Sequence, residues 1–275
     1  MFKLLVTDVD GTLLDHQSKL TEINKRAIKE CIKAGIQVVI ATGKSFASVT
    51  DLIKEFDLQL PQITLGGAVT ITPDGKVIDS VTIPEKFYHE IIDMIRARGY
   101  EPLIATVDGN IYYQKFVPGM KNVMEIGETL CKADNIKKDE FAKHSVSIFL
   151  SITAEDPLDS YIRKKFGSRL LVVRSGKYFF DIQNIKASKG DALKKLIKRL
   201  KIAKNEVISF GDSQNDISLF KESGFSIAVK NSYPELIEIA DAVTDENHKS
   251  GLGKAIYKYI LHKDISSEAF FDTGD

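Results

Sequence analysis

Cysteine is nearly absent from this chain of 275 residues, which contains only Cys31 and Cys131. Two cysteines are too few for a disulfide framework or a thiolate metal site. Cys31 also falls at helical spacing with Ala27 and Ile28, so we expect it in the core rather than at a reactive position. Any chemistry must therefore come from other residue types.

An excess of charge of one sign is also lacking, because 38 Lys and Arg are balanced by 38 Asp and Glu. This balance removes the long-range attraction on which nucleic-acid binders rely, and we expect no nucleic-acid partner. The five histidines show no ligand spacing, which argues against a zinc site. One basic run is interpreted as a solvated helix surface: Lys194, Lys195, Lys198, Arg199 and Lys201.

Long hydrophobic runs are missing as well, since nowhere do about 18 apolar residues follow one another. The N-terminus enters a short apolar strand directly and lacks the apolar stretch and cleavage site of a signal peptide. We therefore expect no membrane partner and a cytoplasmic location. The oligomeric state is left open.

Short apolar runs and helical stretches alternate over residues 3–72, which indicates βαβ units and a parallel sheet. The pattern changes after Pro84, where helices and short strands no longer alternate regularly, and it returns at Lys189. We expect strands at 4–6, 38–41, 63–65, 77–83, 111–116, 146–152, 170–174, 178–182, 207–210, 227–229 and 242–244. We expect helices at 21–34, 46–56, 87–98 and 157–166.

These patterns predict an α/β fold with two domains. A Rossmann-like parallel-sheet core domain is expected to comprise residues 1–82 and 187–275, and an α+β domain, residues 83–186, to be inserted into it. The tail after Lys263 is expected to be loosely held.

Two acidic motifs directly follow expected strands. The first is Asp8-Val9-Asp10-Gly11-Thr12, and the second is Gly211-Asp212-Ser213-Gln214-Asn215-Asp216. Ligands of open parallel sheets bind beyond the carboxyl ends of the strands, so these carboxylates are expected to meet at one edge. Like charges brought together repel unless a cation neutralises them, which implies Mg²⁺. Read alone, each motif could instead be a turn that caps the next helix.

Two further pairs suit a phosphate group. Thr42-Gly43 follows the second expected strand, and Lys189-Gly190 opens a helix. A hydroxyl, a backbone N–H in a turn and an ammonium group are donors that phosphate oxygens require. Each pair alone is weak, since Thr-Gly is a common turn and lysines are common on surfaces.

Together these positions resemble the haloacid dehalogenase superfamily of phosphohydrolases, specifically its Cof-type members with a large α/β cap of type C2. The resemblance covers nearly the whole chain, and the order and spacing of the motifs fit. It is carried by Asp8-Val9-Asp10-Gly11-Thr12-Leu13-Leu14-Asp15, Ala41-Thr42-Gly43, Ser188-Lys189-Gly190 with Ala192-Leu193, and Gly211-Asp212-Ser213-Gln214-Asn215-Asp216. The inserted domain would then be the cap, which sets substrate choice.

The resemblance also implies a role for each motif residue. Asp8 would be the nucleophile that forms an aspartyl-phosphate, and Asp10 would protonate the leaving group and then activate water. Mg²⁺ would be held by Asp8, Asp212 and the backbone carbonyl of Asp10. Phosphate would be bound by Thr42, Lys189, Asn215 and the backbone near Val9 and Gly43, with Asp216 in support by orienting Lys189 or a metal-bound water.

Two departures from the family pattern concern substrate contacts. Lys44 stands where the family commonly has Arg, which keeps the charge but loses the bidentate fork. Gly66-Gly67-Ala68 stands where Asn-Gly-Ala is frequent, which removes a side-chain amide. Besides Lys44, candidate substrate contacts are Tyr112, Tyr113 and Arg174, although strand aromatics are more often simply packed.

The expected function is a Mg²⁺-dependent phosphohydrolase that acts on small phosphorylated metabolites, with sugar phosphates as the first guess. One alternative is a phosphotransferase or phosphomutase, which passes the phosphoryl group to an alcohol instead of water. A second alternative is a non-catalytic phosphoacceptor signalling domain. Asp10 speaks against the latter, because an acid and base two residues after the nucleophile serves rapid hydrolysis.

Overall fold

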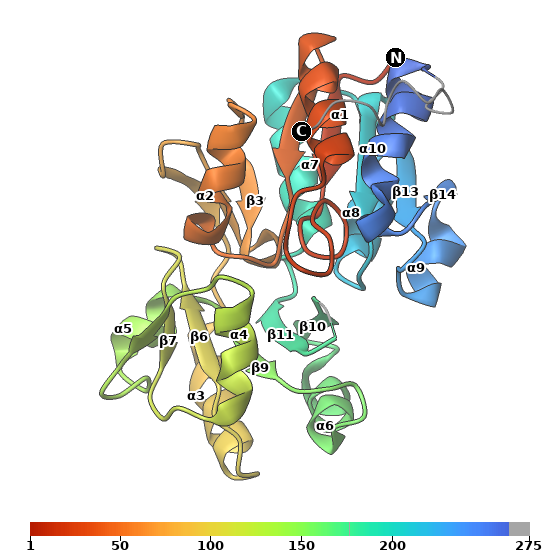
Figure 1. The fold of residues 1–275 in the computed structure, drawn as a ribbon. Coiled ribbons are helices and arrows are strands. Elements are labelled where there is room, and N and C mark those ends of the chain that lie inside the picture. The colour runs from red at the N-terminus through yellow and green to blue at the C-terminus, as the bar shows by residue number, and fades with distance from the viewer. Residues whose placement is uncertain (176, 264–275) are drawn as a thin grey trace.

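The computed structural model describes residues 1–175 and 177–263 of the chain. Figure 1 shows two lobes, each built on a sheet of its own. The red, orange and blue parts of the chain share the upper lobe, which we call the core lobe, and the yellow and green middle part forms the lower one, the cap lobe. The tail for which we expected loose attachment lies outside the described residues.

The sheet of the core lobe has five parallel strands in the order β14-β13-β12-β1-β2. They are β1 (Leu4–Thr7), β2 (Gln37–Ile40), β12 (Val207–Gly211), β13 (Phe225–Val229) and β14 (Ala242–Thr244). The pairing of β1 with β12 joins the first part of the chain to the last. Because parallel strands all end at the same edge, the residues after β1, β2 and β12 lie close together there.

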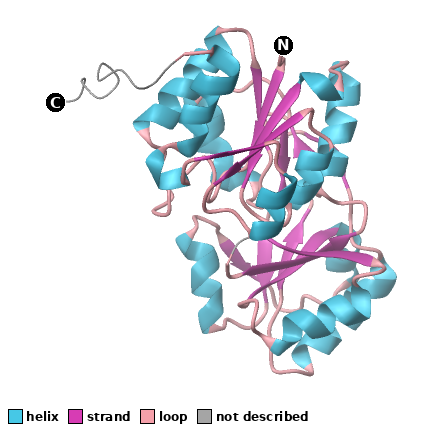
Figure 2. Ribbon diagram, turned by 90° about the vertical axis from the view of Figure 1, so that its right-hand side faces the viewer, coloured by secondary structure: helices cyan, strands magenta, loops and turns pink. Residues whose placement is uncertain are grey.

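Helices cover both faces of this sheet (Figure 2): α1 (Glu22–Lys33), α2 (Phe46–Glu55), α7 (Lys189–Leu200), α8 (Asp216–Lys221), α9 (Pro234–Ile239) and α10 (Gly251–Ile256). Successive strand residues point to opposite faces, so Leu5 packs with α1 and α10 whereas Leu4 and Val6 pack with α7. Cys31 is buried in the first of these clusters, where burial raises the pKa of its thiol to about 12. No helix in the described ranges is long and apolar enough to cross a membrane.

The strand expected at 63–65 lies at the margin of this sheet rather than within it. β3 (Gln62–Thr64) meets the end of β2 through a single parallel bridge between Ala41 and Ile63. Its ladder is antiparallel to β4 (Val69–Ile71), which pairs in turn with β5 (Val77–Ser80). The expected strand at 77–83 is therefore present as β5 in a small three-stranded sheet.

The cap lobe has a six-stranded sheet in the order β10-β11-β9-β6-β7-β8, in which β7 and β8 pair in parallel and the other neighbours antiparallel. The strands are β6 (Leu103–Thr106), β7 (Ile111–Tyr113), β8 (Leu130–Lys132), β9 (Ser145–Ser151), β10 (Leu170–Arg174) and β11 (Phe179–Asn184). Its helices are α3 (Glu85–Arg96), α4 (Lys121–Glu125), α5 (Asp139–His144) and α6 (Pro157–Phe166). The predicted architecture, a parallel-sheet core with an additional α+β part, is confirmed.

Arg174 does not lie where we expected a substrate contact. It is 2% exposed, and its guanidinium binds the carboxylate of Asp159 on α6 at 2.5 and 2.8 Å. The period of two along β10 explains this placement, because Arg174 shares the helix-covered face with Phe180, its partner on β11. The next residue, Ser175, instead lines a pocket between the two lobes.

Tyr112 and Tyr113 are not among the residues that line this pocket. Tyr112 packs edge-on against Phe141 of α5, with ring centroids 5.0 Å apart. Tyr113 packs against Phe116, with ring centroids 5.7 Å apart. Each tyrosine thus packs against a neighbouring aromatic ring, and the expectation that the two contact substrate stays a prediction.

Replacing Arg174 by Met is expected to destabilise the protein rather than alter substrate choice. Asp159 would keep its contact with Arg163 at 2.5 Å but would lose the guanidinium of Arg174. The carbonyls of Ile152 and Thr153 would lose the same donor. Breaking a buried ion pair from one side is costly, so the free energy of unfolding should fall by about 2–4 kcal/mol in urea denaturation. The control Lys164→Met, at an exposed position of α6, should change it by less than about 0.5 kcal/mol. An equally small effect of Arg174→Met would contradict this role.

Candidate active site

Three carboxylates meet at the carboxyl edge of the core sheet. Asp8 follows β1, Asp212 follows the neighbouring strand β12, and Asp216 is the first residue of α8. One carboxylate oxygen from each lies within 4.8 Å of the others. The adjacency of β1 and β12 in the sheet therefore brings together residues that are about 200 positions apart in the sequence.

A single buried ammonium group connects two of these carboxylates. Lys189 is 0% exposed, and its Nζ lies 2.7 Å from Oδ1 of Asp8 and 2.7 Å from Oδ1 of Asp216. It is the first residue of α7, which begins after Ser188, whose hydroxyl caps the helix by accepting the N–H of Asp191. The other oxygen of Asp216 accepts the N–H groups of Asp212 and Ser213, so this carboxylate holds both Lys189 and the loop after β12.

The charges of this cluster shift its pKa values in a consistent direction. Burial raises the pKa of Asp212 well above its usual range, and the charges of Asp8 and Asp216 raise it further. Burial raises the pKa of Asp216 to about 6 against the opposing effect of Lys189. Burial alone would lower the pKa of Lys189, but the two carboxylates outweigh it and the pKa is raised.

The donor set fits a divalent cation. Carboxylate oxygens are the ligands that hard cations such as Mg²⁺ prefer, and one ammonium group leaves the three carboxylates undercompensated. Gly11 makes room for this arrangement: a Cβ at this position, where φ is +80°, would lie 2.5 Å from Oδ2 of Asp212. Thr12 donates its hydroxyl to Oδ1 of Asp212 at 2.9 Å and so orients that side chain.

Asp10 points into the same pocket beside Lys44, whose Nζ lies 3.3 Å from Oδ1 of Asp10. Burial raises the pKa of Asp10, and the ammonium of Lys44 opposes that shift. The Lys44 ammonium also donates to the carbonyl of Ile126 in the cap lobe. Lys44 therefore lines the pocket and joins the candidate acid to the opposite lobe, and its contact with substrate stays a prediction.

The remaining residues with an expected phosphate role lie around the carboxylates. Thr42, Gly43 and Asn215 line the pocket, while the side chain of Val9 is buried in the core between Asp8 and Asp10. Oδ1 of Asn215 is buried and has no hydrogen-bond partner among residues 1–175 and 177–263. These positions are compatible with phosphate binding, which stays a prediction.

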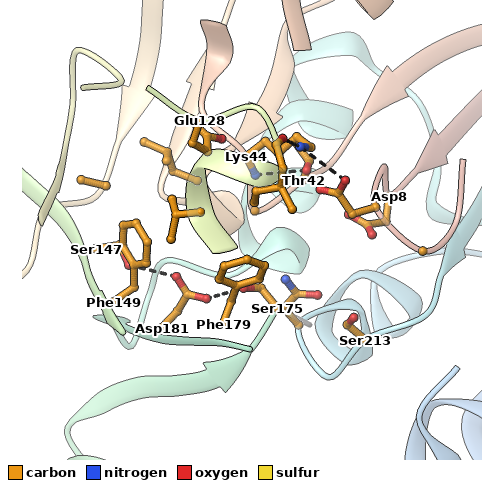
Figure 3. A pocket seen from close by; sticks show the side chains of 18 of the residues that line it. Asp8, Thr42, Lys44, Glu128, Ser147, Phe149, Ser175, Phe179, Asp181 and Ser213 are labelled. Carbon is orange, nitrogen blue, oxygen red and sulfur yellow. Dashed lines mark hydrogen bonds and ion pairs between the residues drawn. The ribbon is translucent and has the colours of Figure 1, made fainter. Parts of the chain in front are cut away.

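The pocket has a volume of about 260 Å³ and lies between the two lobes (Figure 3). The core lobe supplies the motif residues, and the cap lobe supplies a wall that the sequence reasoning missed: Ala105, Ile111, Val123, Ile126, Glu128, Ser147, Phe149, Ser175, Lys177, Phe179, Asp181 and Gln183. One signal was available, since Asp181 and Gln183 place polar side chains at a spacing of two beside the apolar residues of β11. The others depend on which face of each strand turns toward the core, which the sequence alone does not specify.

Glu128 forms a direct contact between the lobes. Its carboxylate, 7% exposed, accepts the backbone N–H of Ser45 at 2.8 Å and the Ser45 hydroxyl at 2.6 Å. Ser45 is the N-cap residue of α2, so a side chain of the cap lobe places negative charge at the start of a helix in the core lobe. The neighbouring carbonyl of Gly127 accepts the hydroxyl of Ser48 at 3.2 Å.

The departure at Gly66 has a counterpart in the cap lobe. A Cβ at position 66, where φ is +67°, would lie 3.0 Å from both Nε2 and Oε1 of Gln183. The amide of Gln183 thus occupies the space beside the missing side chain, and Nε2 donates to the carbonyl of Leu65 at 2.7 Å. A side-chain amide is therefore present at this place, although a different strand supplies it.

The chain is similar to known proteins over almost its whole length, and residues 5–256 match the family described as haloacid dehalogenase-like hydrolase. Phosphatase YwpJ of Bacillus subtilis is 28% identical over 94% of this chain and 100% of that protein. The 5-amino-6-(5-phospho-D-ribitylamino)uracil phosphatase YcsE of the same bacterium is 26% identical over 94% of this chain and 96% of that protein. A solved haloacid dehalogenase-like hydrolase from B. subtilis has a TM-score of 0.83 at 25% identity, over 94% of this chain and 100% of that chain.

Replacing Lys189 by Met is expected to destabilise the protein more at pH 8 than at pH 5. The folded pKa of Asp216, about 6, lies above its ordinary value, so its ionisation lowers stability as the pH rises through that interval. Without Lys189 the cost of ionising Asp216 increases, and it is relieved only where Asp216 binds a proton. We expect the free energy of unfolding to fall by about 3–5 kcal/mol at pH 8 and by clearly less at pH 5.

Urea denaturation at the two pH values measures this difference. Lys198→Met, at an exposed position of the same helix, serves as the matched control and should have little effect at either pH. An equal loss for Lys189→Met at both pH values would show that the charge of Lys189 does not balance the carboxylates.

Proposed function

Because the chain belongs to the haloacid dehalogenase-like hydrolase family and is a phosphatase of the Cof type, we propose that it removes phosphate from small phosphorylated metabolites through an aspartyl-phosphate, with Mg²⁺ as cofactor. The observation that carries the proposal is the position of Asp8. Its carboxylate lies in the pocket, 2.7 Å from the Lys189 ammonium and beside Asp212, with Asp10 two residues away. A carboxylate in this position can act as a nucleophile toward a phosphate bound in the pocket.

In the first step Asp8 attacks the phosphorus atom of the ester. Lys189 holds Oδ1 of Asp8, so the other oxygen forms the new bond to phosphorus while the bond from phosphorus to the leaving oxygen breaks. The leaving alkoxide takes a proton from Asp10. The raised pKa of Asp10 supports this acid role, because it favours the protonated carboxyl.

In the second step water replaces the aspartate on phosphorus. Asp10, now ionised, takes a proton from the attacking water, the bond between phosphorus and Asp8 breaks, and Asp8 and inorganic phosphate are regenerated. The same group thus donates and accepts one proton per cycle. Lys44, 3.3 Å away, stabilises the ionised form of Asp10 between the two steps.

The charge on the phosphate oxygens requires donors and a cation. Thr42, Lys189, Asn215 and the backbone N–H groups near Val9 and Gly43 are the proposed donors, and Asp216 holds Lys189 in place at 2.7 Å. Asp8, Asp212 and the backbone carbonyl of Asp10 are the proposed Mg²⁺ ligands. When bound, Mg²⁺ supplies positive charge that compensates the carboxylates and the phosphate.

The substrate is proposed to be a small phosphorylated metabolite, with sugar phosphates as the first class to test. The pocket of about 260 Å³ supports a small leaving group, and the relative YcsE is named for a phosphoribityl compound. A cytoplasmic location likewise stays a prediction.

Residues 83–186 are proposed to be a cap domain that closes over the site. The two connections to the core lie side by side, since Nδ2 of Asn184 donates to the carbonyl of Thr82 at 2.8 Å. Adjacent connections permit a hinge, and the contact of Glu128 with Ser45 supports a closed arrangement. Closure would exclude bulk water from the aspartyl-phosphate.

Asp8→Asn is expected to abolish hydrolysis of p-nitrophenyl phosphate in the presence of Mg²⁺. Asparagine is nearly isosteric but is not a nucleophile, so kcat should fall by about 10³-fold or more while the protein still folds. Asp51→Asn, at an exposed position of α2, is the matched control and should retain normal activity. Near-normal turnover by Asp8→Asn would refute the covalent mechanism.

Activity is also expected to disappear in excess chelator, to return with Mg²⁺ and to be inhibited by Ca²⁺, which takes more ligands at longer distances. Asp212→Asn removes one carboxylate of the cluster, so it should raise the Mg²⁺ concentration for half-maximal activity by about tenfold or more. Calorimetric titration with Mg²⁺ should show the same weakening without any turnover. Full activity of the wild-type protein in chelator would exclude the proposed metal requirement.

A further inference from the structure

The loop that follows β13 reaches both acidic motifs of the site. Nδ2 of Asn231 donates to the carbonyl of Gly11 at 2.9 Å, and the backbone N–H of Tyr233 donates to the carbonyl of Asp212 at 2.9 Å. Gly11 lies in the loop after β1 and Asp212 in the loop after β12, whereas β13 is a neighbour of β12 and not of β1. Neighbouring strands lie about 4.8 Å apart, so the loop after β13 crosses the end of β12 to reach the first motif.

This loop is itself held in place on both sides. The backbone N–H of Asn247, which follows β14, donates to Oδ1 of Asn231 at 2.9 Å. Asn247 is 5% exposed, and its Nδ2 donates to the carbonyl of Leu14 at 2.9 Å. On the other side Pro234 begins α9, and its ring fixes the backbone angle φ directly after Tyr233. The amide of Asn231 is therefore held at its oxygen as well as at its nitrogen.

The carbonyl of Gly11 belongs to the peptide group that leads into Thr12. The hydroxyl of Thr12 donates to Oδ1 of Asp212 at 2.9 Å, and its backbone N–H donates to the carbonyl of Val9 at 3.4 Å. Because a peptide group is planar, a donor on the carbonyl of Gly11 also fixes the direction of the N–H of Thr12. Asn231 thus orients Thr12, and through it the carboxylate of Asp212.

The exposure of Asn231 separates this effect from the stability of the fold. Asn231 is exposed, so water would replace its amide on the carbonyl of Gly11. Substitutions at exposed positions usually change the stability of a protein little. Water has no fixed position, however, and the peptide group after Gly11 would then rotate over a wider range. Asn231 therefore bears on the geometry of the site more than on folding.

We propose that Asn231 is a positioning residue of the Mg²⁺ site. It holds the turn at Gly11, so that Thr12 keeps the carboxylate of Asp212 in place for the cation. Asn231 acts through these neighbours and is not itself a proposed ligand, so its loss should weaken Mg²⁺ binding without removing a ligand. The inference rests on the proposed function, because it presupposes that Mg²⁺ binds at the cluster of carboxylates.

Calorimetric titration with Mg²⁺ alone tests this role without any turnover. Groups that orient a metal ligand typically change metal affinity by about ten- to a hundredfold, and Asn231 acts one step further away. For Asn231→Ala we therefore expect the Kd for Mg²⁺ to rise about fivefold or more. The midpoint of urea unfolding in chelator should change by less than about 0.3 M. The matched control is Asn205→Ala, at an exposed position before β12 and so at the opposite edge of the sheet, which should change neither value.

Hydrolysis of p-nitrophenyl phosphate separates a weakened cation site from a damaged protein. In Asn231→Ala the Mg²⁺ concentration for half-maximal activity should rise by the same factor as the Kd. At saturating Mg²⁺ its kcat should stay within about twofold of the wild-type value. A purely structural role would instead lower kcat at every Mg²⁺ concentration, because fewer molecules would be folded.

Combining the change with Thr12→Val tests the route by which Asn231 acts. Valine has nearly the shape of threonine but cannot donate to Asp212, so Thr12→Val alone should weaken Mg²⁺ binding. Adding Asn231→Ala should raise the Kd less than about twofold further, because residues that act through one another are not additive. Independent effects that multiply would overturn the route through Thr12.

The outcomes separate this inference from the function on which it rests. If the wild-type protein binds and requires Mg²⁺ but Asn231→Ala binds it equally tightly, the positioning role is overturned and the phosphatase stands. A large loss of stability in chelator, with kcat reduced at every Mg²⁺ concentration, overturns the role as well. If the wild-type protein neither binds nor requires Mg²⁺, the proposed function fails and the inference fails with it.

Discussion

The repulsion among three closely spaced carboxylates is the constraint on which the site depends. Asp8, Asp212 and Asp216 bring their oxygens within 4.8 Å, and one buried ammonium, Lys189, balances two of them directly. Such an arrangement lowers the stability of the folded protein, as the raised pKa of Asp212 and Asp216 indicates, and the hydrophobic clusters on both faces of the core sheet must offset that cost. A divalent cation bound among these carboxylates would relieve their repulsion.

The topology explains how a few side chains from distant parts of the chain form one site. Because β1 and β12 are neighbours and parallel, the loops that follow them lie at one edge, and α7 brings Lys189 to the same point from a third part of the chain. The insertion between these segments supplies the opposite wall of the pocket. The contact of Glu128 with Ser45 at the start of α2 and the contact of Lys44 with Ile126 tie that wall to the core lobe.

Sequence reasoning could predict the core-lobe side but not the cap-lobe side of this pocket. Asp8 and Asp212 follow strands, and Lys189 opens a helix. At such positions the motif and its place in a parallel sheet both predict where the side chain lies. In the cap lobe a shift of one residue reverses the face of a strand, which is why Arg174 is buried against α6 while Ser175 lines the pocket. The short elements β6, β8 and α5 were missed because three to six residues carry too little periodicity.

The most direct test of the account is to find the phosphoryl group on Asp8. Wild-type protein mixed with a ³²P-labelled phosphate ester and Mg²⁺ is quenched in acid within one turnover, reduced with borohydride and digested. The account predicts labelled protein that loses its label in hydroxylamine, and conversion of residue 8 to homoserine, because borohydride reduces an acyl phosphate to the alcohol. Rapid turnover without any labelled protein, or a label on another residue, would contradict it.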